Sequence, residues 1–167
     1  MGMSVIISAA TAEDVEQIFR LQYLCFQREA ELYDNYRIDP LVQSLDAVRS
    51  EVADDLVFVA RLGDEVVGSV RGFTDPDGTG QIGKLCVHPR LQGHGLGTRL
   101  LNAAESALAA QRAATRFRLH TGHRSESNLR LYRRAGYAQV GNATGTDGVQ
   151  LILLEKEVAA QEFVASA

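Results

Sequence analysis

A glycine-rich segment in the middle of the chain has the residue types and spacing of an anion-binding turn. Gly93, Gly95 and Gly97 lie between an apolar run that ends at Val87 and an amphipathic helical pattern that begins at Leu96. Glycines let backbone N–H groups converge without interference from Cβ atoms. The unpaired N–H groups of a first helical turn also favour an anion there. The segment therefore predicts a phosphate cradle whose donors are backbone groups.

Two other phosphate-binding patterns share these glycines, and both fail on specific residues. A dinucleotide fingerprint needs Gly-x-Gly-x-x-Gly, and Thr98 occupies the place of the third glycine. That fingerprint also needs an acidic residue at the end of the next strand, where this chain has His120. A P-loop closes on Gly-Lys-Ser/Thr, and the segment has no lysine. A nucleotide-dependent oxidoreductase is therefore the weaker interpretation.

A second segment, further along the chain, agrees with the first one and leads to a resemblance. The pattern Gln-x-x-Gly-x-Gly at 92–97, preceded by Leu-x-Val-x-Pro at 85–89, resembles the acetyl-coenzyme A motif of the GNAT superfamily of N-acetyltransferases. Asparagine at 128, Leu-Tyr at 131–132 and Gly-Tyr at 136–137 resemble a later segment of the same family. The order of the expected elements also fits that fold, so the similarity spans nearly the whole chain.

The resemblance implies how acetyl-coenzyme A would be held. The backbone at 85–87 would pair with the pantetheine arm like an added strand, and an N–H near Val87 would polarise the acetyl carbonyl. The glycine-rich segment would hold the pyrophosphate, and Asn128 would bond to the pantetheine arm. The thioester would lie in a gap where two parallel strands separate beyond Val87. The implied binding residues are Leu85, Cys86, Val87, Gln92, Gly93, His94, Gly95, Leu96, Gly97, Thr98 and Asn128.

Tyr132 is the residue whose chemistry suits the departing thiolate. Acetyl transfer to an amine needs a neutral amine and a stabilised leaving group. A lysine-like amine has a pKa of about 10.4, so about one molecule in a thousand is neutral at pH 7. A phenol with a pKa of about 10 can share its proton with a thiolate whose thiol resembles cysteine. Tyr132 stands where the family has its tyrosine, so we expect it to be the catalytic acid; packing beside Leu129 is the alternative.

The sequence does not assign a general base. Gln81 occupies the place where the histone-acetylating branch of the family has a glutamate, and an amide cannot accept the proton. A base that acts through water is a further alternative. The other candidates are the histidines and three residues on or after the first helix, which could line an acceptor pocket: His88, His94, His120, His123, Glu29, Glu31 and Tyr33.

Composition narrows the class of protein. The chain has 167 residues, 46% of them hydrophobic and 23% charged, with a net charge of -4. These values are typical of one globular domain, which we expect to span residues 1–167. A basic stripe for nucleic acid and an apolar window of about 18 residues for a membrane are both missing from the sequence. We therefore expect neither partner.

The two cysteines are expected to be structural. Cys25 and Cys86 are far apart in the sequence and lie in apolar periodic segments, which predicts two buried free thiols and a reducing cytoplasm. Cys86 alternates with Leu85 and Val87 as a strand residue, so we expect direct transfer in a ternary complex rather than an acyl-cysteine intermediate. The chain has no Cys-x-x-Cys and only four histidines, so we expect no metal site.

Periodicity predicts the elements that must position these residues. Strands are expected at 5–8, 56–62, 66–73, 81–87, 116–121, 137–143 and 149–156, and helices at 12–33, 45–53, 96–108 and 126–134. Thr11, Ser44 and Ser125 are expected helix caps. The unit at 81–121 is a strand–helix–strand crossover, which makes its two strands parallel. The predicted class is α/β, with one mixed, mostly antiparallel sheet around that crossover and helices on both faces.

Together these observations predict an acetyl-coenzyme A-dependent N-acetyltransferase whose acceptor is a primary amine on a small molecule or peptide. A coenzyme A-binding regulatory module without turnover is the alternative. Acidic residues at 29, 31, 34 and 39 would suit a cationic acceptor, although a solvated face explains them equally well. The apolar run from Leu151 to Leu154 is a candidate homodimer interface.

Overall fold

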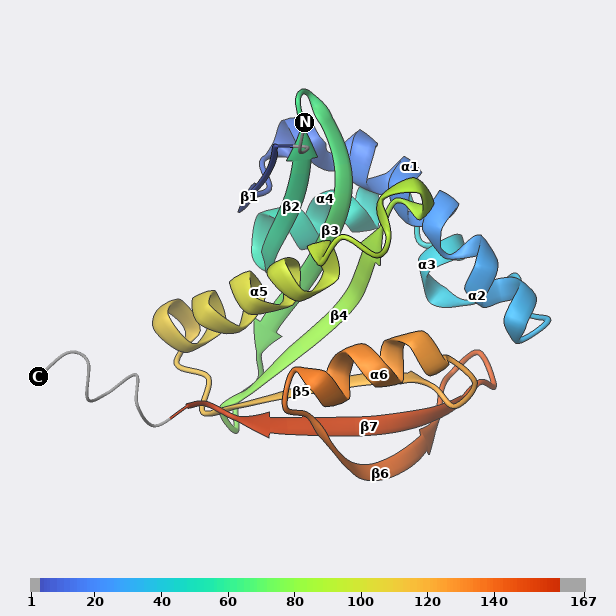
Figure 1. The fold of residues 1–167 in the computed structure, drawn as a ribbon, viewed down its shortest axis with the longest axis vertical. Coiled ribbons are helices and arrows are strands. Elements are labelled where there is room, and N and C mark those ends of the chain that lie inside the picture. Colours follow the sequence, from blue (N-terminus) through green and yellow to red (C-terminus); the bar gives the residue numbers. More distant parts are fainter. Residues whose placement is uncertain (1–3, 160–167) are drawn as a thin grey trace, which may run out of the picture.

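The structure is a computed structural model that describes residues 4–159 (Figure 1). Every expected strand is present, with its ends within two residues of the expectation. The strands are β1 (Val5–Ala9), β2 (Leu56–Leu62), β3 (Glu65–Thr74), β4 (Thr79–Val87), β5 (Arg116–Gly122), β6 (Ala138–Thr144) and β7 (Gln150–Glu157). The helices are α1 (Val15–Cys25), α2 (Gln27–Leu32), α3 (Asp39–Val42), α4 (Leu45–Asp54), α5 (Leu96–Arg112) and α6 (Glu126–Arg134), with 3-10 turns η1 (Ala12–Asp14) and η2 (Pro89–Leu91).

The strands form one sheet in the order β1-β2-β3-β4-β5-β7-β6. Neighbouring strands are antiparallel except β4 and β5, which α5 connects as a crossover. Helix α5 packs on one face of the sheet, while α1 and α4 pack on the other (Figure 1). This arrangement confirms the predicted fold class.

Strands β4 and β5 pair over a very short length. The pairing joins residues 79–81 to residues 116–118, and the strands separate beyond Gln81 (Figure 1). The expectation that they separate beyond Val87 was therefore wrong by six residues. The cause lies in β4, where the register with β3 shifts and Lys84 has a φ of +50°. A bulge of this kind bends the strand and ends its pairing early.

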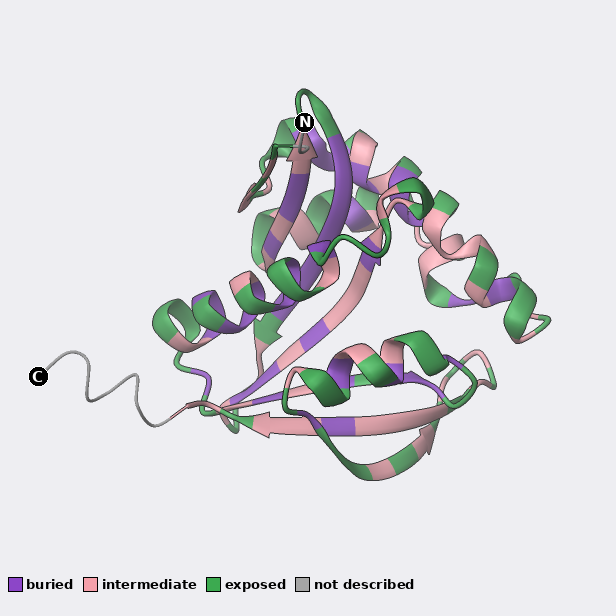
Figure 2. Ribbon diagram, in the orientation of Figure 1, coloured by how far each residue is buried: buried purple, intermediate pink, exposed green. Residues whose placement is uncertain are grey.

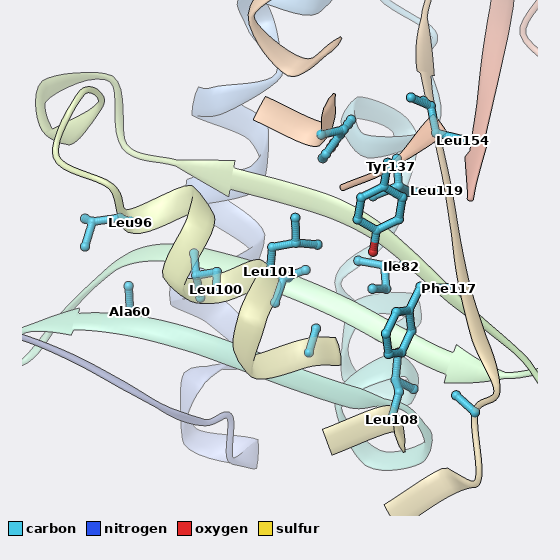
Figure 3. Packing of buried hydrophobic residues seen from close by; sticks show 14 of the residues in the cluster. Ala60, Ile82, Leu96, Leu100, Leu101, Leu108, Phe117, Leu119, Tyr137 and Leu154 are labelled. Atoms are coloured by element: carbon cyan, nitrogen blue, oxygen red, sulfur yellow. The ribbon is translucent and has the colours of Figure 1, made fainter. Parts of the chain in front are cut away.

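Helix α5 lies directly on the glycines of β3. The side of α5 that packs on the sheet is largely buried (Figure 2), and the fully buried Leu100 and Leu108 project from the helix toward the sheet (Figure 3). A Cβ at Gly68 would lie 2.9 Å from Leu100 Cδ1, and one at Gly72 would lie 2.9 Å from Leu108 Cδ1. A larger side chain on β3 would push the helix away, so these two glycines set the distance between helix and sheet.

The N-terminal helical region is more broken than periodicity predicts. The expected helix at 12–33 begins with the 3-10 turn η1 and is interrupted at Phe26, which separates α1 from α2. Pro40, expected to interrupt the chain, instead lies in the first turn of the short helix α3, where proline is tolerated. The predicted cap at Ser44 is confirmed, because its side chain accepts a hydrogen bond from the Ala47 N–H at 3.1 Å.

The apolar run in β7 belongs to the interior of the sheet. Strand β7 lies between β5 and β6, so both of its edges are hydrogen-bonded. Leu154 is fully buried in the core that α5 covers, and Leu151 faces a cavity. The chain itself therefore accounts for these apolar residues, and the homodimer stays a prediction without support from this strand.

Candidate active site

A cavity of about 1150 Å³ opens between the glycine-rich segment, α2 and the start of α6. We call it the loop cavity. It collects most of the residues that the sequence predicted to bind the co-substrate, while His94 is exposed and lies outside the lining. The predicted residues that line it are Leu85, Cys86, Val87, Gln92, Gly93, Gly95, Leu96, Gly97, Thr98 and Asn128.

The start of α5 has the geometry of an anion cradle. Gly93 and Gly95 have φ values of +84° and +78°, a region that favours glycine. The first hydrogen bond of the helix runs from the Arg99 N–H to the Gly95 carbonyl at 3.1 Å, so the N–H groups of residues 96–98 have no intrahelical partner. A Cβ at Gly95 would meet no atom within 4 Å, so the space beside these donors is open. A pyrophosphate fits this arrangement.

The side chain of Gln92 links the glycine-rich loop to the end of β4 through a hydrogen bond. Its Nε2 donates to the Val87 carbonyl at 3.2 Å, and the Cys25 thiol contacts the same oxygen at 3.4 Å. The sequence assigned Gln92 to the pyrophosphate, whereas its side chain here positions the loop. The backbone N–H groups further along carry the cradle.

The two cysteines meet where α1 packs on the sheet. Helix α1 places the Cys25 thiol against the thiol of Cys86 on β4, and both are free. Cys86 is buried as expected, whereas Cys25 is only half-buried, which corrects the expectation of two buried thiols. The hydrogen bond to Cys86 and burial raise the pKa of Cys25. The remaining polar contact of Cys86 is the Ser69 hydroxyl at 3.9 Å, which is not a base.

A second cavity of about 530 Å³ lies in the gap between β4 and β5. We call it the sheet cavity. Two cations line it, but acidic side chains already pair with them: Lys84 Nζ lies 3.2 Å from Glu51 and from Asp39, and Arg71 Nε lies 3.1 Å from Glu51. Acidic groups outnumber these cations, so the cavity suits a cationic ligand. The acidic residues in its lining are Glu29, Asp39, Glu51, Asp55 and Asp147.

Tyr132 forms part of the wall of the sheet cavity. It is 6% exposed and packs edge-to-face on Tyr137, with ring centroids 6.2 Å apart. Burial, with a smaller effect from the charge of Glu29, raises the pKa of Tyr132, so its phenol keeps its proton over the whole neutral range. The hydroxyl is therefore a proton donor rather than a base.

The other candidate bases lie in different places. Among the histidines, only His120 lines either cavity, and it is the sheet cavity. The His88 ring accepts a hydrogen bond from the Arg90 N–H, and Gln81 donates to Asp75 at 3.0 Å. Within residues 4–159, no group of three or more His, Cys, Asp or Glu side chains is arranged to hold a metal ion. No described helix is long and apolar enough to cross a membrane.

Glu29 is one of the candidate bases that the sequence offered without choosing among them. The sequence gave it as a residue that could line an acceptor pocket and as one of several acidic residues near the first helices, and in the structure it lines both cavities. The available signal was its spacing: Gln22, Cys25 and Glu29 follow one another at three and four residues, which places them on one helical face. A carboxylate on the face that packs against the sheet is unusual.

Comparisons with known proteins agree with this geometry. The Acetyltransferase (GNAT) family matches residues 13–137, and no curated protein matches the sequence. The yncA protein of Salmonella typhimurium, solved with acetyl-CoA, has a TM-score of 0.74 at 16% identity over 93% of this chain and 95% of that one. An aminoglycoside 6'-acetyltransferase type Ii has a TM-score of 0.73 at 21% identity over 92% of this chain and 97% of its own.

A third solved structure has the same fold. The ribosomal-protein-S18-alanine N-acetyltransferase of Escherichia coli has a TM-score of 0.73 at 17% identity, over 93% of this chain and 95% of that one. At these identities the solved structures establish the fold alone, while the family match covers most of the chain. The glycine cradle, the gap between the parallel strands and the family match lead to one conclusion: this chain belongs to the GNAT acetyltransferase family.

Proposed function

We propose that the protein transfers the acetyl group of acetyl-coenzyme A directly to a primary amine of a small molecule or peptide, in a ternary complex. The observation that carries this proposal is the meeting of two different cavities at the gap between β4 and β5. One cavity has a backbone cradle for phosphates, and the other is rich in acidic side chains. Two of the solved structures with this fold, an aminoglycoside 6'-acetyltransferase and a ribosomal-protein-S18-alanine N-acetyltransferase, support an amine as the acceptor.

The residues of the loop cavity would bind acetyl-coenzyme A, and those of the sheet cavity would bind the acceptor. The N–H groups of residues 96–98 would bind the pyrophosphate, and Asn128 and the backbone at 85–87 would bind the pantetheine arm, because all of them line the loop cavity. The acidic sheet cavity would hold the acceptor as its ammonium ion. Tyr132 would donate its proton toward sulfur as the carbon–sulfur bond breaks.

A transfer assay with three probe amines tests the proposal. The purified chain is incubated with acetyl-coenzyme A and, in turn, with kanamycin, spermidine and a peptide that has an N-terminal alanine. We expect mass spectrometry to show an acetylated amine and an equal amount of released coenzyme A for at least one probe. If calorimetry shows that acetyl-coenzyme A binds while no probe is acetylated, the regulatory module without turnover becomes the better interpretation.

Replacement of Gly97 by valine should weaken acetyl-coenzyme A binding at least tenfold, about 1.4 kcal/mol. A Cβ at Gly97 would meet only Leu131 Cδ2, at 3.4 Å, so the chain has room for the substitution, but the side chain enters the loop cavity. The same change at Gly95 would also strain a residue with positive φ, so Gly97 is the cleaner test. Isothermal titration calorimetry gives the Kd.

Ser106→Val is the matched control for this prediction. Ser106 is exposed on the same helix and lies outside the lining of both cavities. The Kd of the Ser106→Val variant for acetyl-coenzyme A should equal that of the parent protein. An unchanged Kd in the Gly97→Val variant would show that the cradle does not hold the co-substrate.

A further inference from the structure

The junction between the two cavities has a single ionisable side chain within the described residues. Four residues line both cavities: Phe26, Glu29, Leu85 and Asn128. Two of these are apolar and one is a neutral amide, so only Glu29 can exchange a proton. An amine in the sheet cavity must lose its proton where it meets the thioester, and that meeting place is this junction.

Neutral hydrogen-bond donors hold the Glu29 carboxylate in place. The Ser125 hydroxyl lies 3.1 and 3.0 Å from its two oxygens, and Asn128 Nδ2 donates at 3.3 Å. Tyr33 supports Ser125, with 2.7 Å between the two hydroxyl oxygens, and accepts from the Arg124 N–H at 2.9 Å. Ser125, expected to cap α6, therefore donates to Glu29 and makes no side-chain cap bond.

This set of partners differs from that of the other carboxylates nearby. Glu51 and Asp39 pair with Lys84, and such pairing lowers the basicity of a carboxylate. Glu29 has no cation among its described partners, and the titratable groups that face it are the phenols of Tyr132 and, through Ser125, Tyr33. Burial raises the pKa of Glu29, and the Ser125 bond offsets part of the rise. A carboxylate in this position is a stronger base than an ordinary glutamate.

We propose that Glu29 is the general base of the reaction, an inference that rests on the proposed function. The carboxylate takes a proton from the acceptor ammonium. The freed lone pair of nitrogen forms a bond with the acetyl carbonyl carbon, and the carbon–sulfur bond breaks with its electron pair going to sulfur. Tyr132 supplies the proton that sulfur gains. The nitrogen loses a second proton to give the neutral amide, and this proton restores the Tyr132 hydroxyl through solvent, while Glu29 releases its own proton to solvent. His120 lines only the sheet cavity and is exposed, so it is less well placed than Glu29.

Glu29→Gln tests this role, because the amide keeps an oxygen for Ser125 but cannot take a proton. With any probe amine that the parent acetylates, we expect kcat/KM at pH 7 to fall at least tenfold. The parent should lose activity as pH falls through the pKa of Glu29. The Glu29→Gln variant should not show this decrease at low pH. Its kcat/KM should instead rise about tenfold per pH unit, because the neutral amine becomes more abundant.

The loss should also depend on the amine. An α-amino group has a pKa of about 7.7–8.0 and a lysine-like amine about 10.4, so the first needs less help to lose its proton. The Glu29→Gln variant should therefore lose less activity with the alanine peptide than with spermidine. A role confined to packing would lower both rates equally and leave the pH profile unchanged.

Controls separate this inference from the proposed function. Glu16→Gln, an exposed change on α1 outside both cavities, should retain parental kinetics. Glu29→Asp keeps a carboxylate and should recover part of the activity with a parental pH profile, and it gives this result even if Glu29→Gln folds poorly. If Glu29→Gln stays within threefold of a working parent with the same pH profile, the base assignment fails alone. If the parent acetylates none of the three probes, the proposed function fails as well.

Discussion

Tyr132→Phe will lower kcat about 100-fold and leave the Kd for acetyl-coenzyme A unchanged, because general acids supply about 10²–10⁴-fold and water can replace part of this one. The phenylalanine ring keeps the edge-to-face contact with Tyr137, so packing is retained. The lost hydroxyl is a group whose proton is held firmly, since burial raises the pKa of Tyr132. A donor of this kind acts when negative charge develops on sulfur, which is the step that kcat reports.

Steady-state kinetics under conditions where chemistry is rate-limiting will measure this effect. Tyr137→Phe is a suitable control, because the Tyr137 hydroxyl donates to Glu105 at 2.7 Å and lines neither cavity. That variant should be less stable while its kcat stays within twofold of the parent. A Tyr132→Phe variant that also stays within twofold would remove Tyr132 from the role of acid.

The second large effect concerns the packing of α5. Leu108→Ala should lower the free energy of unfolding by about 3 kcal/mol, because it removes a fully buried side chain and leaves a cavity. Gly72→Ala should lower it by about 1–2 kcal/mol, because the new Cβ would lie 2.9 Å from Leu108 Cδ1. In the double variant the new methyl group occupies space that the leucine has left. The combined loss should be smaller than the sum by at least about 1 kcal/mol.

Urea denaturation of the four proteins in this cycle provides the free energies. Leu101→Ala combined with Gly72→Ala is the comparison, because the three atoms nearest to a Cβ at Gly72 all belong to Leu108. Those two losses should add. Additive losses in the Leu108 cycle as well would show that the glycine does not set the separation between helix and sheet.

Most of the framework follows from local patterns. Alternation and helical spacing predict each strand and the long helix α5, because one face of every element must be buried. The cradle is equally local, since it needs only the glycines at 93 and 95 and the first turn of α5. The capping residue Ser44 behaves as its neighbours in the sequence predict.

The remaining site depends on contacts between distant residues. The sequence around Ser125 predicts a helix cap. In the structure the Ser125 hydroxyl instead donates its hydrogen bond to Glu29, which lies 96 residues away in the chain. The sequence predicts Cys25 and Cys86 as separate buried thiols, and their contact arises only from the packing of α1 on β4. The early separation of β4 and β5 results from the backbone at Lys84, whose positive φ has no signal in a lysine side chain.

The short junction between β4 and β5 also has a mechanical consequence. Among the described residues, the backbone hydrogen bonds that join strands β1–β4 to strands β5, β7 and β6 lie at residues 79–81 and 116–118. The two parts of the sheet are therefore joined at one end, and β4 and β5 diverge from that point (Figure 1). Each strand residue adds about 3.3 Å, so the far end of β5 lies about 13 Å beyond Arg118, and a rotation of about 5° moves it by about 1 Å. Displacements of that size can change rates about 100-fold when reacting atoms must approach to about 3–3.5 Å. Substitutions of side chains packed at this junction, such as Phe117 beside Gly80, are therefore expected to change the reaction rate although they lie outside both cavities.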